Sequence, residues 1–380
     1  MTVVHVSSAH PWTDNRILYR ECVSLTEAGY SVTLIATESV VEGPATAVRV
    51  LRIPRRRRFS RMLISTVSAI RLALLTRARI THLHDPELIP FIPLLRLAGR
   101  TVLYDAHEDL PNQVVNKPYV KKPLVPLFMC FARLLILLSK LSHHVICATE
   151  TIAKRYPAHR RTVVHNYPPL REEETVADQY AASNRDALAV YVGGIASIRG
   201  AETMVDAMAE NDLPETWKLV IAGSGPDSLL ADLRSRPGWR RVDFRGQLPP
   251  DDARRLLLEA QVGLVLLSDT AAHRDALPTK MFEYFAAGTP VIASDFPLWR
   301  SIIQEHSCGL LVDPTSSSQV AAAIRRYSEE PGLLDRHSRN ARRLAREELN
   351  WSSEAKALVA AYQRLSGKPR DLGREVTPHA

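Results

Sequence analysis

Two short segments in the first half of the chain concentrate side chains that could do chemistry. One is His82-Leu83-His84-Asp85-Pro86-Glu87 and the other is Asp105-Ala106-His107-Glu108-Asp109. Zinc and iron prefer imidazole and carboxylate ligands, so one interpretation is a metal-dependent hydrolase. The alternative is structural, with His84 and His107 each capping the end of a strand. We expect His82 on the opposite face of its strand, packed or exposed.

A second group of polar residues lies in the C-terminal half. Asp275 and Glu283 stand eight residues apart, on either side of a helix expected to begin at Pro278, with Lys280 in its first turn. A helix N-terminus and an ammonium group favour a phosphate, and a carboxylate accepts hydrogen bonds from sugar hydroxyls. The alternative is an amphipathic helix that packs through its aromatic residues and leaves Glu283 in solvent.

Two glycine turns follow strand-like segments of the same half. Gly193 and Gly194 form the first and Gly223 begins the second, while Arg199 opens the helix after the first turn. Glycines permit close approach to the backbone, so a diphosphate would fit beside Arg199. Neither turn has the full dinucleotide-binding pattern, which combines the glycine spacing G-x-G-x-x-G with an acidic residue about 20 positions downstream. Two ordinary strand-to-helix turns remain the alternative.

Short apolar runs alternate with helix-length segments along the whole chain. This alternation predicts an α/β fold with doubly wound parallel sheets, in which ligands bind beyond the carboxyl ends of the strands. The simplest arrangement is two Rossmann-like domains that face each other across a cleft. The predicted strands are Val3–Ser7, Ser31–Ala36, Ile80–Leu83, Thr101–Tyr104, Val145–Ala148, Thr162–His165, Leu188–Val192, Lys218–Ala222, Val242–Phe244, Val262–Leu267 and Pro290–Ala293.

The segment from Asp275 to Ile292 resembles the Glu-x7-Glu signature of the retaining family 4 glycosyltransferases (glycosyl transferases group 1), which have the GT-B fold. Asp275 stands where the family has its first glutamate. The helix from Trp351 is similar to the family's last helix, which returns to the first domain. The resemblance extends over nearly the whole chain through Val3–Ser7, Asp14–Arg16, Tyr104–Asp109, Val164–Pro168, Gly193–Gly200, Gly223–Pro226, Phe244–Gly246 and Cys308–Val312.

The pattern and the resemblance together predict five parts of the chain. Residues 1–168 form an acceptor-side Rossmann-like domain and 169–186 a linker. Residues 187–350 form a nucleotide-sugar-binding Rossmann-like domain. Residues 351–365 form the returning helix, and 366–380 form a flexible tail.

The resemblance also implies a donor site. Glu283 would accept hydrogen bonds from the ribose hydroxyls, and Asp275 with the backbone after it would hold the sugar ring. Arg199 and Lys280 would neutralise the diphosphate, and Arg245 would frame the base. The turns at Gly193, Gly194 and Gly223 would approach the donor closely. Gly194 stands where the family usually has a basic residue, and Lys280 or Arg16 is the expected replacement.

The resemblance assigns the reacting centre to His107 together with Asp275. His107 would face the donor sugar beside the acceptor, and the departing diphosphate would take the acceptor's proton, so neither a protein base nor a metal or cofactor is expected. The family's Gly-Gly pair in the first loop is missing, and His10–Arg16 takes its place. The residues expected on the acceptor side are Asp14, Asn15, Arg16, His84, Asp85 and Glu87.

The function implied is transfer of a sugar from a nucleotide-diphosphate donor, a UDP-sugar by family habit, to an acceptor hydroxyl with retention of configuration. The acceptor would be a sugar, a lipid-linked sugar or a natural product, in the biosynthesis of envelope polysaccharide, glycolipid or glycosylated natural products. One alternative is a sugar-nucleotide epimerase on the same scaffold, which would turn over the donor without acceptor. Another is a non-catalytic nucleotide-sugar sensor.

The net charge of +8 is local. Residues 49–79 hold ten arginines and no acid, so the other residues of the 380 sum to −2. Basic charge confined to one segment, with only 6% aromatic residues, does not indicate a nucleic-acid partner. The four cysteines are widely separated, which predicts neither a disulfide framework nor a zinc site and favours the cytoplasm.

The basic segment contains a predicted membrane-facing helix. Arg55–Arg58 precede Phe59–Leu75, where Phe59, Met62, Leu63, Val67, Ile70 and Leu74 recur at helical spacing. Residues 49–79 therefore suit an anionic membrane surface on the cytoplasmic side. The alternatives are a core helix behind a solvated loop, or a site for an anionic acceptor. Lysines at 117, 121 and 122 favour the membrane, although the apolar stretch 124–141 is too short to span one.

Overall fold

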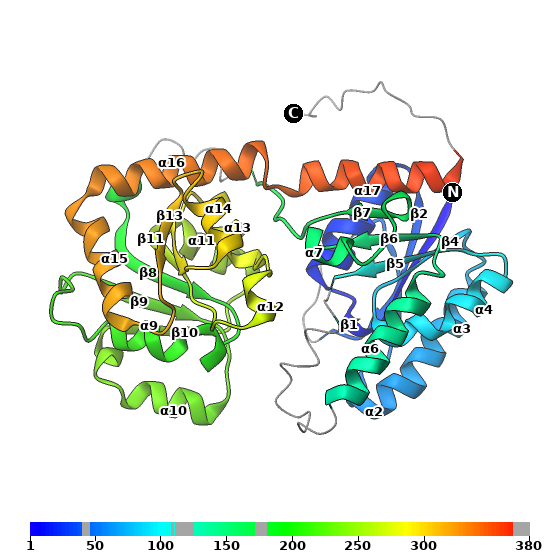
Figure 1. Ribbon diagram of the computed structural model, residues 1–380, viewed down its shortest axis with the longest axis horizontal. Coiled ribbons are helices and arrows are strands. Elements are labelled where there is room, and N and C mark those ends of the chain that lie inside the picture. The colour runs from blue at the N-terminus through cyan, green and yellow to red at the C-terminus, as the bar shows by residue number, and fades with distance from the viewer. Residues whose placement is uncertain (40–45, 108–109, 111–124, 172–180, 368–380) are drawn as a thin grey trace. The chain divides into compact units, whose positions relative to one another are not determined.

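The computed structural model describes residues 1–39, 46–107, 110, 125–171 and 181–367, without the side chain of Arg58. These residues form two compact units (Figure 1). The N-terminal unit runs from Met1 to Asn166 and includes the C-terminal segment from Trp351, and the C-terminal unit is Tyr167–Asn350. Several predictions lie outside the described residues. They concern Glu108, Asp109, the three lysines at 117, 121 and 122, the linker residues 172–180 and the tail residues 368–380.

The N-terminal unit is built on a seven-stranded parallel sheet of order β3-β2-β1-β4-β5-β6-β7. Six of its strands were predicted, with ends that differ by a few residues. The edge strand β3 was not, because its two arginines were read only as part of the basic segment. The strands are β1 (Thr2–Pro11), β2 (Ser31–Thr37), β3 (Arg49–Ile53), β4 (Ile80–Leu83), β5 (Thr101–Ala106), β6 (His144–Cys147) and β7 (Arg161–Val163).

Helices pack on both faces of this sheet. Val4 and Val6 of β1 lie in a core with α3, α4 and α6, whereas Val3 lies in a second core with α1 and α17, as strand alternation requires. The helical segments are η1 (Asn15–Cys22), α1 (Val23–Glu27), α2 (Arg58–Ser60), η2 (Arg61–Ser65), α3 (Thr66–Leu75), η3 (Pro86–Phe91), α4 (Ile92–Leu97), α6 (Val125–Ser139), α7 (Glu150–Ala153), η5 (Ala158–Arg160) and α17 (Trp351–Ser366).

The predicted single apolar face of Phe59–Leu75 is wrong. A π-helical turn, η2, interrupts the segment and shifts the phase of the side chains before α3 begins. The buried face of α3 consists of Thr66, Ala69, Ile70 and Ala73. Of the six residues expected to share one face, Ile70 is buried and four are exposed: Phe59, Met62, Leu63 and Val67.

The C-terminal unit is built on a six-stranded parallel sheet of order β10-β9-β8-β11-β12-β13. Five strands were predicted; the short strand β13 was recognised only as part of the resemblance. The strands are β8 (Asp186–Val192), β9 (Lys218–Ala222), β10 (Val242–Gly246), β11 (Ala260–Val265), β12 (Val291–Ser294) and β13 (Gly309–Val312).

Two cores lie in the C-terminal unit, one on each face of its sheet. Met204, Trp217 and Tyr327 belong to the first, and Tyr284 and Trp299 to the second. The helical segments are η7 (Ala182–Asn184), η8 (Ser197–Arg199), α9 (Ala201–Ala207), α10 (Asp227–Ser235), η9 (Pro237–Arg241), α11 (Pro250–Glu259), α12 (Ala271–Arg274), α13 (Thr279–Ala286), α14 (Pro297–Ile303), α15 (Ser317–Glu329) and α16 (Pro331–Glu347).

Both strand orders reverse direction at one point. The chain winds outward on one side from β1 and on the other from β4, and the same reversal occurs between β8 and β11. Such switch points open a crevice at the carboxyl ends of the strands, where ligands bind in doubly wound sheets. The polar clusters singled out in the sequence follow these strands in both units.

Candidate functional site

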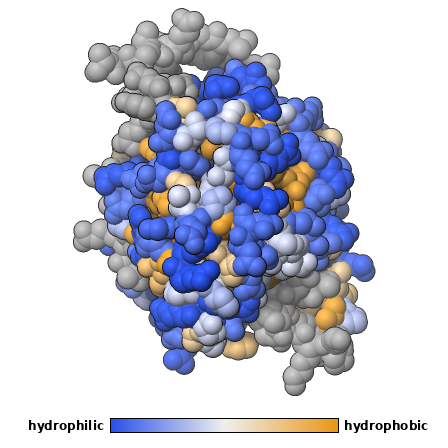
Figure 2. Space-filling view, turned by 90° about the vertical axis from the view of Figure 1, so that its left-hand side faces the viewer, coloured by the Kyte–Doolittle hydropathy of each residue, from blue (hydrophilic) through white to orange (hydrophobic). Residues whose placement is uncertain are grey.

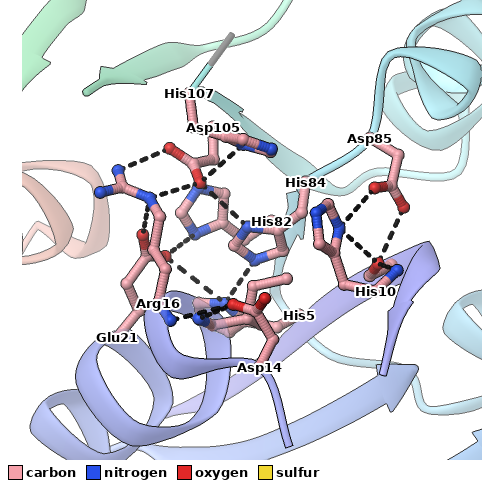
Figure 3. Close-up of polar contacts among 12 residues, drawn as sticks. His5, His10, Asp14, Arg16, Glu21, His82, His84, Asp85, Asp105 and His107 are labelled. Carbon is pink, nitrogen blue, oxygen red and sulfur yellow. Dashed lines mark hydrogen bonds and ion pairs between the residues drawn. The ribbon is translucent and has the colours of Figure 1, made fainter. Parts of the chain in front are cut away.

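The switch point of the N-terminal unit holds a cluster of fully buried ionisable side chains (Figure 3). His5 on β1 pairs in register with His82 on β4, and His84 follows two residues later. These three histidines, Glu21 and Asp105 have 0% exposure. The prediction that His82 lies on the opposite face is wrong, because residues two apart on a strand share a face; the rings of His82 and His84 are 4.6 Å apart.

Arg16 and Asp105 form the charged centre of this cluster. The guanidinium donates from Nε and Nη2 to the two carboxylate oxygens at 2.9 and 2.8 Å, and its Nη1 donates to the carbonyl of Val164. Burial opposes ionisation of Asp105, but Arg16, His107 and His84 hold its pKa well below the usual range. The guanidinium of Arg16 is therefore already hydrogen-bonded to Asp105 and Val164 within this unit.

Two histidines at the carboxyl edge are each backed by a carboxylate. His107 places Nδ1 3.4 Å from Oδ2 of Asp105, and although burial lowers its pKa, Asp105 raises it overall. His10 places Nδ1 2.8 Å from Oδ1 of Asp85. The two imidazole rings meet edge to face, with centroids 5.3 Å apart. Both side chains are partly exposed, at 32% for His10 and 18% for His107.

Asp85 is the anchor of the first of these pairs. Its Oδ2 accepts hydrogen bonds from the hydroxyl of Ser7 and from the backbone N–H groups of Ser8 and Ala9. Burial would raise its pKa, but His10, Ser7 and Ser8 lower it to about 2. Asp85 is therefore a permanent carboxylate that orients the imidazole of His10.

The other residues predicted on the acceptor side have distinct positions. Asp14 caps η1 by accepting from the N–H groups of Arg16 and Ile17, and Asn15 is exposed. Glu87 forms an ion pair of 3.0 Å with Arg61. His84 and Asp85 are buried and do not line the carboxyl edge of the sheet themselves. His84 contacts Asp105, and Asp85 contacts His10, which is partly exposed at that edge.

Four buried residues have side chains of the kinds that hold a metal. Ligand atoms of His5, Glu21, His82 and His84 lie within 4.8 Å of one another. The sequence had instead grouped His82 and His84 with Asp85 and His107, but Asp85 turns toward His10. His5, His10 and Glu21 were not predicted from the sequence as site residues. His5 stands two residues after Val3 on β1, and this spacing, which puts both on one face of the strand, was a usable signal.

The switch point of the C-terminal unit is formed by two glycine turns in contact. Gly223 has a φ of +153°, and a Cβ atom there would lie 1.8 Å from the carbonyl oxygen of Gly193. Gly193 itself has a φ of +139°. Only glycine fits where the two turns approach each other so closely. The backbone at the ends of β8 and β9 is therefore not covered by side chains at these positions.

Two cations lie against the first glycine turn. A Cβ on Gly193 would be 3.1 Å from Nζ of Lys280, and one on Gly194 would be 2.9 Å from Nη1 of Arg199. Nζ of Lys280 is buried with no hydrogen-bond partner among the described residues and lies 3.8 Å from the ring centre of Tyr191. Burial and the nearby Arg199 lower the pKa of Lys280 to about 7, against a smaller opposing effect of Glu283.

The remaining predicted residues of this unit surround the turn. Glu283 lies in the second turn of α13, half-buried, and Asp275 is exposed at the end of α12. Arg245 near the end of β10 is exposed and paired with Asp243 at 3.0 Å. Tyr191, whose hydroxyl donates to the carbonyl of Gly194 at 2.6 Å, was not predicted as a site residue. The structure therefore brings Gly193, Gly194, Gly223, Arg199 and Lys280 together, with Glu283 on the helix that carries Lys280.

A pair of half-sites, each at the switch point of a parallel sheet, defines a two-domain α/β protein of the GT-B type. Residues 172–344, which lie within the C-terminal unit, match the family described as glycosyl transferases group 1. A relative, the D-inositol 3-phosphate glycosyltransferase of Jonesia denitrificans, is 27% identical over 207 residues, which are 52% of this chain and 48% of that protein. The chain spans about half the length of the curated relatives it matches.

Solved structures resemble the whole chain. Sucrose-phosphate synthase from Thermosynechococcus elongatus has a TM-score of 0.73 at 18% identity, covering 96% of this chain and 99% of that one. The HepE protein of Anabaena in complex with UDP-glucose has a TM-score of 0.68 at 14% identity, covering 97% of this chain and all of that one. At these identities the likeness establishes the GT-B fold that the sequence predicted.

Proposed function

We propose that this protein is a retaining glycosyltransferase that moves a sugar from a UDP-sugar to an acceptor hydroxyl. The observation that carries the proposal is the pair of cations, Lys280 and Arg199, against the bare backbone of the glycine turns. A buried ammonium without a hydrogen-bond partner among the described residues suits a diphosphate that would supply oxygen ligands. The UDP-glucose complex of the structurally similar HepE protein supports uridine diphosphate as the carrier.

Each half-site has a role in this reaction. Lys280 and Arg199 would neutralise the charge that develops on the departing diphosphate, which is the main electrostatic contribution to catalysis. Glu283 would accept hydrogen bonds from the ribose, Arg245 would frame the base, and Asp275 would hold the sugar ring. The acceptor oxygen bonds to the anomeric carbon as the bond to phosphate breaks, and the diphosphate takes the acceptor's proton.

The N-terminal half-site would receive the acceptor at its carboxyl edge. His107, whose ring is held by Asp105, would orient the reacting centre and stabilise positive charge on the sugar ring through its backbone carbonyl. Arg16 and His84 would act through Asp105, and Asp85 through His10. Asp14 would position the start of η1, while Asn15 and Glu87 would complete the acceptor side. The reaction would need no protein-bound metal or cofactor.

The test of the donor site is Glu283→Ala. We expect it to abolish sugar transfer from UDP-glucose, followed as UDP release in a screen of acceptors, while the circular dichroism spectrum stays unchanged, because the carboxylate contributes to no buried core. Glu259→Ala, at the end of α11 in the same unit, is the matched control and should keep full activity. Full activity of Glu283→Ala would contradict the site.

The second part of the proposal is docking of the N-terminal unit on an anionic membrane at the cytoplasmic face. The large hydrophobic side chains that are exposed among the described residues all lie in this unit, except Ile198. The face of the molecule in Figure 2 is in contrast largely hydrophilic, with apolar residues scattered on it. Eleven of the exposed residues belong to α2–α3 and α6: Phe59, Met62, Leu63, Ile64, Val67, Leu75, Leu127, Phe128, Phe131, Leu134 and Leu137.

Charge next to these helices favours an anionic partner. Arg55, Arg56 and Arg57 are exposed directly before α2, within the basic segment 49–79. Both α3 and α6 contact η3 and pack in the same core, so the two helices lie on the same face of the N-terminal sheet (Figure 1). No helix among the described residues is long and apolar enough to cross a bilayer. A lipid-linked acceptor would be reached from such a docked position.

A further inference from the structure

Three buried side chains, those of Tyr362, His5 and His84, link the C-terminal helix α17 to the carboxylate of Asp105, and His82 contacts the same phenol. The hydroxyl of Tyr362 lies 2.8 Å from Nδ1 of His82 and 3.2 Å from Nε2 of His5. Nδ1 of His5 lies 2.9 Å from Nε2 of His84, whose Nδ1 lies 3.2 Å from Oδ2 of Asp105. Figure 3 shows the histidine part of this chain. Tyr362 and all three histidines are fully buried.

The positions of the protons follow from the acceptor at one end. Asp105 is paired with Arg16 and is ionised, so it only accepts, and Nδ1 of His84 must carry a hydrogen. Burial keeps the imidazoles neutral, with lowered pKa values for His5, His82 and His84, so Nε2 of His84 is bare. Nδ1 of His5 must then donate to that nitrogen, which leaves Nε2 of His5 bare as well.

Among the contacts described, only the hydroxyl of Tyr362 can donate a hydrogen bond to Nε2 of His5. The phenol O–H donates to Nε2 of His5, and since the phenol has one hydrogen, its oxygen accepts from Nδ1–H of His82. Every link therefore has one donor and one acceptor, and all three histidines are Nδ1–H tautomers. In water the Nε2–H tautomer of histidine predominates, so the network selects the less common form.

We propose that Tyr362 is a positioning residue for the N-terminal half-site: its hydroxyl completes the His5–His84 chain that holds Asp105 against Arg16 and His107. Removal of the hydroxyl leaves Nε2 of His5 buried without a hydrogen-bond donor. If the hydrogen bonds from His5 to Asp105 reversed their direction instead, Nδ1 of His84 would lose its hydrogen and present a lone pair to the carboxylate. Either change loosens the support of Asp105, and with it the orientation of His107. The C-terminal helix thus acts on the acceptor side through hydrogen bonds.

A divalent metal is the competing occupant of the same residues. It would need lone pairs on both Nδ1 of His5 and Nε2 of His84, which face each other at 2.9 Å, a distance that fits one shared hydrogen. Nε of Arg16 also lies 3.1 Å from Oε1 of Glu21, and this positive charge disfavours a cation beside it. The hydrogen-bonded arrangement is therefore favoured, and metal content becomes an outcome of the test.

The first experiment needs no substrate. Long-range 1H–15N spectra of the wild-type protein should show His5, His82 and His84 as neutral Nδ1–H tautomers that do not titrate near neutral pH. In Tyr362→Phe the Nε2 signal of His5 should move to the position of a nitrogen without a hydrogen bond, and the signals of His107 should shift. Nε2–H tautomers in the wild type, or one equivalent of tightly bound zinc in the purified protein, would overturn the proposal.

Tyr327→Phe is the matched control. The hydroxyl of Tyr327 bonds to Nδ1 of His337 at 2.9 Å and is buried in the C-terminal unit. Tyr327→Phe thus removes the same kind of phenol–imidazole hydrogen bond in the unit that does not contain the network. We expect changes only at His337, so that a general effect of removing a buried hydroxyl is separated from the effect on the chain to Asp105.

The second experiment rests on the proposed function and measures UDP release from UDP-glucose. Tyr362→Phe should lower kcat about ten-fold, the order expected for a slightly displaced catalytic side chain, and leave the Kd for UDP within two-fold. Tyr327→Phe should change neither quantity. Wild-type kcat in Tyr362→Phe would overturn the positioning role. Absence of UDP-glucose binding to the wild type would count against the proposed function and leave the tautomer result standing.

Discussion

Lys280 is the residue whose environment is most specific to an anionic ligand. Its ammonium is held over the ring of Tyr191 and close to Arg199, so burial and like charge both favour the neutral amine. A pKa lowered to about 7 means that, at pH 8, most molecules of the free protein carry an uncharged Lys280. A diphosphate oxygen beside the nitrogen would restore the charged form, because it favours the ammonium.

Binding of UDP-glucose should therefore take up a proton. Above pH 7 the complex holds a proton that the free site has lost, so affinity should fall as pH rises from 7 to 9, by at most ten-fold per pH unit, and should level off below 7. Isothermal titration calorimetry at pH 8, in buffers with different ionisation enthalpies, measures the uptake, and we expect close to one proton.

Lys280→Arg provides the control, because a guanidinium stays charged throughout this range. This variant should bind without proton uptake and without the steep pH dependence. Equal uptake in wild type and variant would show that the proton goes elsewhere, and would contradict the role of Lys280.

At the residue scale the sequence predicted the glycine turns and Arg199, which follow a strand, and Lys280, which lies in the first turn of α13. It did not predict the roles of His5, Glu21 or Tyr362. Tyr362 lies 280 residues beyond His82 along the chain, and only the packing of α17 on the N-terminal sheet brings the two together. A buried network of this kind has no local pattern, since each member is defined by its partners.

At the element scale the segment from Arg58 to Leu75 shows how a helical period can mislead. The period of 3.6 residues predicted one apolar face, but the π turn η2 changes the number of residues per turn. Small residues of α3, Ala69 and Ala73, pack on the sheet instead, and Phe59 and Leu63 remain in solvent at 85% and 72% exposure. Exposed side chains of this size, next to three arginines, are the basis of the membrane proposal.

Replacement of Arg55–Arg58 by serine should weaken binding to vesicles that contain anionic lipid. Each arginine near a charged bilayer contributes about 1 kcal/mol, so the partition coefficient should fall at least ten-fold, as measured by co-sedimentation. Binding of wild type to purely zwitterionic vesicles should be much weaker, and affinity for UDP should be unaffected by the substitution.

A charge-matched control is available in the C-terminal unit. Serine at Arg240, Arg336, Arg339 and Arg343 removes the same charge from that unit, and it should leave vesicle binding nearly unchanged. Equal losses in both variants would mean that net charge alone acts, and unchanged binding after replacement of Arg55–Arg58 would return this segment to a solvated loop.

Strand prediction succeeded where β-branched residues are buried on both faces. It missed two edge strands, β3 and β13, although it found the other two, β7 and β10. β3 and β13 are the outermost strands of their sheets and are only partly buried. The sequences Arg-Val-Leu-Arg-Ile and Gly-Leu-Leu-Val are short and carry weaker strand signals than central strands such as β1 and β11. The central strands, which position both half-sites, are thus the ones that local sequence defines best.

At the scale of the whole molecule, the helix α17, which follows the C-terminal unit in the sequence, completes the N-terminal unit. Trp351 begins α17, donates from its indole nitrogen to the hydroxyl of Ser24 at 2.8 Å, and packs in a core with Leu25 and Leu34. The N-terminal unit therefore needs residues from both ends of the sequence, whereas the C-terminal unit is one continuous segment with its own cores.

Separate cores predict that UDP-glucose stabilises one unit selectively. In differential scanning calorimetry we expect two transitions, of which only that of the C-terminal unit moves upward with ligand. At a ligand concentration 100 times Kd the stabilisation is about 2.7 kcal/mol, which for a unit of this size raises the midpoint by roughly 5–10 °C.

Tyr327→Phe and Tyr362→Phe identify the transitions, since each should lower the midpoint of its own unit. Glu283→Ala should show both transitions with a smaller ligand shift, because the ribose contact is lost while both cores are retained. A ligand shift confined to the transition that Tyr362→Phe lowers would place the donor in the N-terminal unit and contradict the assignment of the two half-sites.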